Sequence, residues 1–434
     1  AVRRRMSGEG ARIGRYRWSI CALLFCVITI NYVDRQVIGV LKPVIEKDMG
    51  WSEVDYGNIV TAFQASYGIG LLVVGRWLDK VGTRKGMAIA IALWSVAAAF
   101  HSVARSVLAF ILARAALGLS ESAAYPGAVK SVAEWFPRQE RALGVRILNA
   151  GANVGVLLTP IAGIMVAGMW GWRAAFLVTG LLGLLVLVAW LRMYRLPEDH
   201  PHILAPERAH IVQDGEDAAG PPLGWSAALR QRQAWYFICG KFFTDPVWYL
   251  FLFWLPDFFS KTQGMNLFPT GRGSVFSTIG PALIAVYLLA DVGSIAGGWL
   301  SSHWIKRGWS VNRARKTTLF IAAVCALPLV SVASIDNAAI VVLLIGLGTA
   351  GHQAFSSNIF AMITDLYPRR AVATVAGMGG AAGAVGGILM AQATGWTLQL
   401  TGSYVPIVLY AGIAYLLAFA VIQLLVPRME PAPL

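Results

Sequence analysis

Charged side chains stand inside long apolar segments of this sequence, and their types suggest anion binding and proton transfer. Asp34 and Arg35 lie in one such segment, and Arg114 and Glu121 lie seven residues apart in another. An ionised side chain costs at least ~2.5 kcal/mol at the centre of a bilayer, so each of these residues is a functional candidate. Arginine can donate two parallel hydrogen bonds to a carboxylate and stays charged when buried. Arg35 is therefore the first candidate for binding an anion.

Glu121 is the first candidate for carrying a proton. Burial disfavours its charged form and a nearby arginine favours it, so an anion that competes for that arginine would change its protonation. The spacing puts Arg114 about two helical turns away on the same face. We predict that Glu121 and Asp34 carry protons, with Arg114 beside them. Two alternatives remain, which are a structural ion pair of Arg35 with Asp34 or Glu121, and a Glu121 that only neutralises Arg114.

Neutral polar residues in other apolar segments offer donors and acceptors for a hydroxylated ligand. Some share a helix face by their spacing, as Gln64 and Tyr67 do. Each can equally be a hydrogen-bonding contact between membrane helices, and His352 can equally be a hydrogen-bonded core residue. The candidates are Tyr32, Gln64, Tyr67, Asn149, Asn153, Trp248, Tyr249, His352, Gln353, Ser357 and Asn358.

Helices long enough to cross a membrane must position these residues. The 434 residues are 57% hydrophobic and only 13% charged, whereas soluble domains carry about a quarter charged residues. Apolar runs such as Ile147–Met169, Ala174–Leu191 and Tyr404–Val426 are close to the ~20 residues that span a bilayer. We count about twelve such helices. The fold class is therefore an all-α membrane protein with twelve transmembrane helices, and a large soluble bundle is excluded.

The basic residues behind the net charge of +14 are distributed over the loops as in a membrane protein. About 25 lysines and arginines fall on the side of the N-terminus and about six on the other side, which predicts that both termini are cytoplasmic. Nucleic-acid binding is not needed to explain the excess. The four cysteines lie in apolar segments without metal-ligand spacing. We expect a multi-pass protein of a bacterial inner membrane and a monomer.

The sequence divides into two similar halves joined by a polar segment. Gly75–Lys85 in the first half resembles Gly297–Ser301 in the second, which is followed by Arg313, Arg315 and Lys316. Glu134–Arg138 likewise resembles Asp365–Arg369. Two parallel repeats predict two pseudo-symmetric bundles with a site between them near the middle of the membrane. The expected parts are a basic cytoplasmic segment 1–17, a six-helix bundle 18–193, a cytoplasmic linker 194–233, a second six-helix bundle 234–427 and a cytoplasmic tail 428–434.

The Gly75–Lys85 segment resembles a signature of the major facilitator superfamily. Asn31–Gln36 and Arg114–Glu121 resemble its anion:cation symporter family, and Thr244–Pro256 and Gly351–Asn358 resemble the bacterial hexuronate branch of that family. The resemblance implies proton-driven import of glucuronate or galacturonate by alternating access. It leaves open another sugar acid or organic anion, such as galactonate or glucarate, and less readily an exporter.

The same resemblance implies a cytoplasmic gate formed by Asp79, Arg84 and Lys85. Ser301 stands in the repeat where Asp79 would be, so a second equivalent gate is doubtful. We interpret Lys241 and Asp245, four residues apart, as charges near a helix end that pair with each other. The glycines between 377 and 387 predict close helix packing rather than a phosphate loop, because no Lys-Ser/Thr follows them.

An enzyme is not expected. The six histidines are scattered, and no nucleophile–base set or metal cluster is recognisable. We expect no cofactor and no catalytic or metal site, and the proton is the coupling ion. The expected partners are a small anionic sugar acid, protons and the lipid bilayer.

Overall fold

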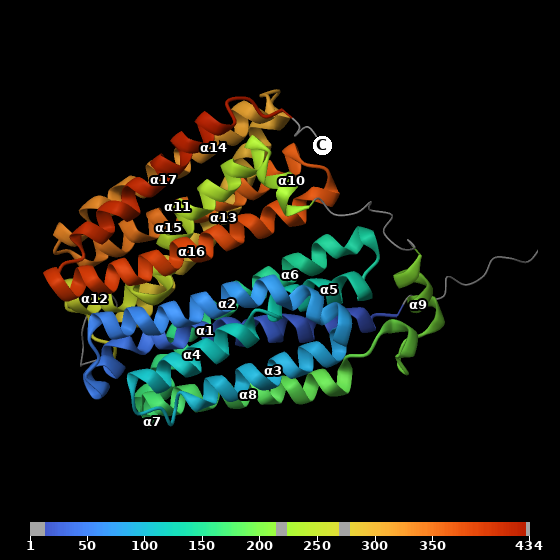
Figure 1. Ribbon diagram of the computed structural model, residues 1–434, viewed down its shortest axis with the longest axis horizontal. Helices are drawn as coiled ribbons and strands as arrows, with labels where there is room; N and C mark the ends of the chain where they lie inside the picture. The colour runs from blue at the N-terminus through green and yellow to red at the C-terminus, as the bar shows by residue number, and fades with distance from the viewer. Residues whose placement is uncertain (1–13, 214–223, 269–277, 431–434) are drawn as a thin grey trace, which may run out of the picture.

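The chain folds into two groups of helices that lie side by side (Figure 1). The computed structural model describes residues 14–213, 224–268 and 278–430. Regular structure in these ranges is helical, apart from one isolated bridge between Asn266 and Thr278. The predicted all-helical class is confirmed. The predicted segment 1–17 and tail 428–434 fall partly outside the described residues.

The first group contains α1 (Tyr16–Met49), α2 (Glu53–Val81), α3 (Thr83–Phe100), α4 (Val107–Glu121), α5 (Ala124–Trp135), α6 (Arg138–Leu158), a π-helical turn (Thr159–Gly163), α7 (Ile164–Trp170) and α8 (Trp172–Met193). We call it the N-terminal bundle. Short helices follow at Pro197–Asp199, α9 (Ala205–Val212) and α10 (Trp225–Leu229). The second group, the C-terminal bundle, contains α11 (Arg232–Phe253), α12 (Leu255–Gln263), α13 (Ile279–Lys306), α14 (Val311–Ala326), a 3-10 segment (Leu327–Ser334), α15 (Ala338–Leu366), α16 (Arg369–Thr401) and α17 (Val405–Leu425).

Ten segments of the described residues are long and apolar enough to cross a membrane. The sequence predicts about twelve, and the long helices outside these ten segments are α3 and α11. Arg84 and Lys85 lower the hydropathy of α3, and Lys241 and Asp245 lower that of α11. Both helices nevertheless lie along spanning helices, α3 beside α8 and α4, and α11 beside α16 and α17. Both helices therefore belong to the same bundles as the segments that have the length and composition of membrane spans.

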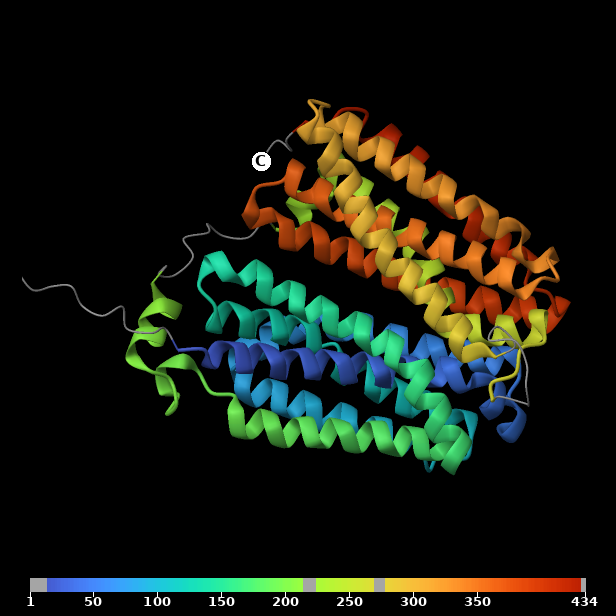
Figure 2. The ribbon, with the colours of Figure 1, turned by 180° about the vertical axis from the view of Figure 1, so that it is seen from behind.

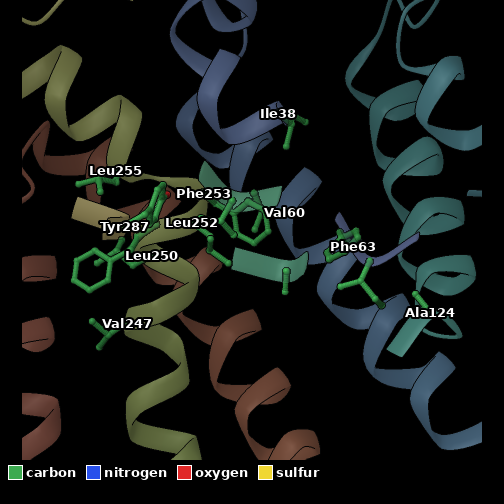
Figure 3. Packing of buried hydrophobic residues seen from close by; sticks show 14 of the residues in the cluster. Ile38, Val60, Phe63, Ala124, Val247, Leu250, Leu252, Phe253, Leu255 and Tyr287 are labelled. Carbon is green, nitrogen blue, oxygen red and sulfur yellow. The ribbon is translucent and has the colours of Figure 1, made fainter. Parts of the chain in front are cut away.

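The two bundles contact each other at the end away from α9 (Figure 2). The Gln392 side chain of α16 donates hydrogen bonds to Asn58 (3.0 Å) and Thr61 (2.8 Å) of α2. The Tyr56 hydroxyl of α2 donates to the carbonyl of Phe253 at 2.7 Å. Beside these bonds, Ile38, Val60 and Phe63 of the N-terminal bundle lie close to Leu252 and Phe253 (Figure 3).

The bundles separate toward the end that carries α9 and α10. A methyl group added to Gly68 of α2 would lie 3.5 Å from Ala384 of α16. Seven residues further toward that end, a methyl group added to Gly75 of α2 or to Gly377 of α16 would meet no atom of another described segment within 4 Å. Residues seven apart lie on nearly the same helix face, so the two facing surfaces diverge there. The described contacts thus close one end of the interface and leave the other end open.

Within the C-terminal bundle, α13 and α15 approach each other through glycine. A methyl group at Gly293 would lie 2.2 Å from the carbonyl oxygen of Ala350 and 2.4 Å from its Cα. Backbone atoms cannot move aside as a flexible side chain can. Small residues at such crossings allow membrane helices to pack without gaps.

Gly293→Ala is therefore expected to destabilise this bundle, because overpacking typically costs ~1–3 kcal/mol. The measurement is the unfolding temperature of the purified protein in detergent. Gly298→Ala on the same helix is the matched control, since the methyl group added there would meet no atom of another described segment within 4 Å. Equal unfolding temperatures for the two variants would contradict this account of the α13–α15 contact.

Candidate functional site

Arg35 of α1 is buried between the helices of the N-terminal bundle and pairs with Glu121 of α4. Its Nε donates to Glu121 Oε2 at 3.1 Å, and its Nη2 donates to Asn31 Oδ1 at 3.4 Å. Both side chains of the ion pair are buried. Of the carboxylates that the sequence offers, Glu121 is the partner of Arg35 in this structure, and Asp34 is not.

Three aromatic rings surround the Arg35 guanidinium. Its Cζ lies 4.5 Å from the ring centroid of Tyr67, 4.9 Å from that of Tyr32 and 5.3 Å from that of Phe63. Such cation–π contacts stabilise a desolvated guanidinium without neutralising it. Tyr32, Arg35 and Tyr67 therefore lie together. Phe63 was missed by sequence reasoning, because one phenylalanine among many apolar residues carries no signal.

The span that contains Glu121 is interrupted beside it. Helix α4 ends at Glu121 and α5 begins at Ala124, so the carboxylate stands at a break inside one membrane-spanning segment. Glu121 Oε1 has no hydrogen-bond partner among the described residues. A buried charged oxygen without a partner is costly. This oxygen is therefore available for a proton or for a donor supplied by a ligand.

Asp34 and Arg114 are buried near this pair and are themselves incompletely bonded. Neither carboxylate oxygen of Asp34 has a hydrogen-bond partner within the described ranges. Arg114 donates from Nη2 to the carbonyl of Arg35 at 3.2 Å, whereas its Nε and Nη1 find no partner there. Its Cζ lies 4.5 Å from the ring centroid of Phe63. No ion pair joins Arg114 to Glu121 in the described part of the chain.

The C-terminal bundle reaches this region through Tyr249 of α11. A methyl group on Gly387 of α16 would lie 2.5 Å from Tyr249 Cδ2 and 2.8 Å from Gln64 Oε1 of α2. The Gln64 amide is buried, and neither of its polar atoms has a partner among the residues that the structure describes. Gln64 and Tyr249 thus meet between the bundles, one helical turn from Tyr67. This level lies close to Gly68, where α2 and α16 begin to separate.

Other predicted residues lie away from Arg35. His352 stacks on Trp248 with ring centroids 5.0 Å apart, and its Nδ1 lies 2.8 Å from the Tyr415 hydroxyl. Asn358 donates to the carbonyls of Gly297 (3.0 Å) and Ala354 (2.9 Å), which joins α15 to α13. These residues line or stabilise the interior of the C-terminal bundle. Ser357 donates to its own helix at 3.0 Å, and Gln353 is half-buried.

Asn149 and Asn153 are exposed on α6. The Tyr125 hydroxyl of α5 donates to Asn149 Oδ1 at 3.1 Å. Tyr125 is a further candidate that the sequence did not single out. Its neighbours Ala123, Ala124 and Pro126 gave no polar pattern around it.

Comparison with known proteins identifies the family. The model of the Major Facilitator Superfamily matches residues 24–391. The chain belongs to this superfamily. It is 29% identical over 391 residues to the hexuronate transporter of Escherichia coli strain K12, covering 88% of each chain. It is 32% identical over 315 residues to the galacturonate transporter of Dickeya chrysanthemi, covering 71% of this chain and 89% of the relative.

The fold agrees with that assignment. A solved bacterial homologue of the human lysosomal transporter Spinster, in an inward-facing and occupied conformation, superposes with a TM-score of 0.75 at 17% identity. The match covers 94% of this chain and 97% of that structure. The resemblance to the superfamily and to its hexuronate-type symporters, predicted from motifs, is confirmed, and the family consists of transporters rather than enzymes.

The predicted gate residues of this superfamily member lie at the open end. Asp79 at the end of α2 accepts a hydrogen bond from Lys130 of α5, and Arg84 donates to the carbonyl of Leu191 at 2.9 Å. Lys85 is exposed. In the second half, Arg315 donates to Ser301 at 3.0 Å and pairs with Asp365 at 3.0 Å. In the second half the cation thus comes from α14 and its carboxylate from α15, whereas in the first half Lys130 of α5 pairs with Asp79 of α2.

The opposite end is closed by an ion cluster that sequence reasoning missed. Lys42 of α1 is 0% exposed and donates to Asp257 Oδ1 of α12 at 2.6 Å, where Asp257 is 1% exposed. Lys42 also pairs with Glu46 (2.8 Å) and Glu53 (3.0 Å). Lys261 of α12 pairs with Glu46 at 3.0 Å. Lysine ammonium groups thus fill the space among these carboxylates and tie α1 and α2 to α12.

Asp257 is held in its charged form by this cluster. Burial alone raises the pKa of this carboxyl, but Lys42 and Lys261 beside it hold the pKa below its ordinary value. The Tyr404 hydroxyl donates to the second oxygen of Asp257. A visible signal existed in the i, i+4 spacing of Lys42 with Glu46 and of Asp257 with Lys261. Spacing alone did not indicate that the Lys42–Glu46 pair and the Asp257–Lys261 pair would contact each other.

Asp257→Asn is expected to loosen this closed end, because it removes the charge that Lys42 contacts across the interface. The measurement is the rate at which a membrane-impermeant maleimide labels Asn58→Cys, in a background without the native cysteines. We expect at least a tenfold faster rate, which corresponds to about 1.4 kcal/mol. Asp55→Asn is the control, because Asp55 caps α2 together with Ser52 and bridges no bundles. Unchanged labelling in Asp257→Asn would exclude a closing role.

Proposed function

We propose that this chain is a proton-coupled symporter that imports hexuronates, glucuronate or galacturonate, by alternating access. The observation that carries the proposal is the buried Arg35–Glu121 pair, which lies beside Tyr32 and Tyr67 close to the level where the bundles separate. A guanidinium in this position binds a carboxylate, and tyrosine hydroxyls beside it serve sugar hydroxyls. The hexuronate and galacturonate transporters among its relatives support this substrate class.

Coupling follows from competition for Arg35. A substrate carboxylate that binds Arg35 takes the place of Glu121, and the displaced carboxylate, buried without its partner, then takes up a proton. After the substrate leaves, Glu121 loses that proton and returns to Arg35. The structure corresponds to this last state, with the ion pair formed. Asp34, with two unbonded oxygens nearby, is the second proton carrier, and Arg114 keeps the local charge balanced.

The hydroxyl groups of the sugar are recognised from both bundles. Tyr32, Gln64 and Tyr67 act from the N-terminal bundle, and Tyr249 acts from the C-terminal bundle. Asn149 and Asn153 reach the substrate from α6. Trp248, His352, Gln353, Ser357 and Asn358 support the C-terminal wall rather than contact Arg35.

Orientation follows from the charge pattern. Arg15, Arg17 and Arg428 lie at the end that carries α9 and α10, which the positive-inside rule assigns to the cytoplasm. The open end of the interface is then cytoplasmic, and Asp79, Arg84 and Lys85 close it in the outward-open state. We assign twelve spans by adding α3 and α11 to the ten apolar segments, in a monomer of a bacterial inner membrane with bundles 18–193 and 234–427.

Two buried acids permit a cycle with two protons. One proton with a monovalent anion moves no net charge. A second proton recruits the membrane potential, which is worth ~2.3 kcal/mol per charge per 100 mV. A dependence of uptake on potential therefore reports the second proton.

A second substrate class has its own support. The chain is 27% identical to a D-galactonate transporter of Escherichia coli and to a probable galactarate/D-glucarate transporter of Bacillus subtilis. These identities are close to that of the hexuronate transporter. Galactonate or glucarate import is therefore the alternative within the same fold and mechanism.

Uptake into proteoliposomes tests the function directly. Labelled glucuronate, galacturonate, galactonate and glucarate are offered separately, with a pH gradient and a membrane potential imposed one at a time. We expect acid-driven uptake of the two hexuronates. Uptake of galactonate or glucarate alone would select the alternative, and indifference to all four anions would refute sugar-acid transport.

Glu121→Gln is expected to abolish accumulation driven by a pH gradient while sparing exchange of internal for external substrate, because the amide cannot take up or release the proton. The measurement compares uphill uptake with counterflow in the same vesicles. Glu140→Gln is the control, since Glu140 pairs with Arg17 at the end of the N-terminal bundle away from the site. Undiminished uphill uptake by Glu121→Gln would remove this coupling mechanism.

Arg35→Lys is expected to lower kcat/KM at least a hundredfold, because an ammonium group cannot reproduce the paired donation of the guanidinium to a carboxylate. The measurement is the initial rate of hexuronate uptake at graded concentrations. Arg173→Lys, on an exposed arginine that pairs with Asp48, is the control and should stay near wild type. Similar kinetics for both variants would place the anion site elsewhere.

A further inference from the structure

A second buried ion pair lies in the C-terminal bundle, within α11. Lys241 Nζ lies 2.6 Å from Asp245 Oδ1, and the two side chains are only 10% and 14% exposed. The expected pairing of these residues is confirmed, but their expected place near a helix end is wrong. Helix α11 runs from Arg232 to Phe253, so both residues lie near its middle.

The ion pair itself joins no two helices, although the Lys241 ammonium also lies 5.1 Å from the ring centroid of Phe360 on α15. Both residues belong to α11, whereas the Lys42–Asp257 pair joins α1 to α12 across the bundle interface. Burying two charges is costly whether or not the pair helps tertiary packing. Ion pairing between helices therefore does not explain why the charges are there.

Helix α16 provides space for a polar row on α11. Tyr249, Asp245 and Lys241 follow each other at intervals of four residues, and Gly387, Gly383 and Gly379 of α16 face them at the same interval. A methyl group would lie 2.5 Å from Tyr249 at Gly387, 2.1 Å from Asp245 Oδ2 at Gly383 and 3.2 Å from Lys241 Cγ at Gly379. Side chains at Gly387 and Gly383 would displace Tyr249 and Asp245, and one at Gly379 would first displace Phe237, which lies beside Lys241.

The row leads from the Arg35 region toward the open end. Tyr249 and Gln64 both lie next to Gly387. This position is close to the level of Tyr67 and Arg35. Lys241 lies eight residues closer to the start of α11, which is about 12 Å along the helix axis. In this direction the facing surfaces of α2 and α16 separate, beyond Gly68 and Ala384. Along the helix axis, Lys241 therefore lies at a level between the Arg35 site and the open end.

We propose that Lys241 is a second cation that binds the carboxylate of the transported sugar acid on its way between Arg35 and the open end, with Asp245 as its partner when no substrate is there. The proposal rests on the sugar-acid transport proposed above. An arriving carboxylate displaces Asp245 from Lys241, as it displaces Glu121 from Arg35. Lysine suits a transient site, because its ammonium is a flexible point charge without the fixed fork of arginine.

The experiment measures the apparent KM separately at the two faces of oriented proteoliposomes. We expect Lys241→Gln to raise the KM for glucuronate at least fivefold at the open face and to leave the KM at the other face near wild type. Asp245→Asn frees Lys241, so it should lower the KM at the open face and slow release. The double variant should resemble Lys241→Gln, because the binding cation is absent from both. Lys306→Gln removes an exposed charge from the same end of the C-terminal bundle and is the matched control.

A merely structural pair gives a different result. Both single variants would then unfold at lower temperature, and the neutral double variant would regain both stability and wild-type KM values at each face. That recovery, or an unchanged KM in Lys241→Gln, would overturn the proposal while wild-type transport still supports the proposed function. A wild-type protein that carries no sugar acid would overturn both.

Glucarate, with two carboxylates, refines the assignment. A loss in Lys241→Gln that is larger for glucarate than for glucuronate supports binding of one dicarboxylate by Arg35 and Lys241 together. An equal loss supports successive binding of a single carboxylate.

Discussion

The positive charge of Arg35 is the constraint on which the rest of the site depends. Arginine does not lose its proton inside a protein, so a buried guanidinium is stabilised best by a carboxylate beside it. In this structure that carboxylate is Glu121, at the break between α4 and α5. Gly118 of α4 lets α2 approach closely, since a methyl group there would lie 2.4 Å from the carbonyl oxygen of Phe63. The contacts of Arg35 with Phe63 and Tyr67 of α2 follow from this approach.

The two ends of the interface are controlled by different kinds of contact. At the closed end, Lys42 and Asp257 form a desolvated pair across the bundles, and Gln392 adds hydrogen bonds to α2. Toward the open end, methyl groups added to Gly75 of α2 and Gly377 of α16 would meet no atom of another described segment within 4 Å. Opening the closed end thus requires new partners for a few buried charges, whereas the packed interior of each bundle can stay as it is.

Charge pairs recur in both bundles with different geometry. Arg35 and Glu121 come from two helices, so their pairing depends on how α1 and α4 pack. Lys241 and Asp245 come from one helix, and their pairing survives any movement of α11 as a body. In the transport cycle proposed here, the Arg35–Glu121 pair forms or breaks as its bundle changes. The Lys241–Asp245 pair stays formed in every state until an anion binds Lys241.

The sequence by itself determined the membrane class and the superfamily, and it predicted roles for Arg35 and Glu121, because charges are rare in apolar segments. Helical spacing also placed Tyr32 beside Arg35. It did not decide which carboxylate pairs with Arg35, since Asp34 is adjacent in the chain and Glu121 is 86 residues away. Lys42 and Asp257, 215 residues apart, meet only through the packing of the bundles. Asn358 is polar in sequence, but packing of α13 against α15 occupies its amide. Such choices belong to tertiary structure, because a buried charge or amide bonds whichever partner the fold brings near.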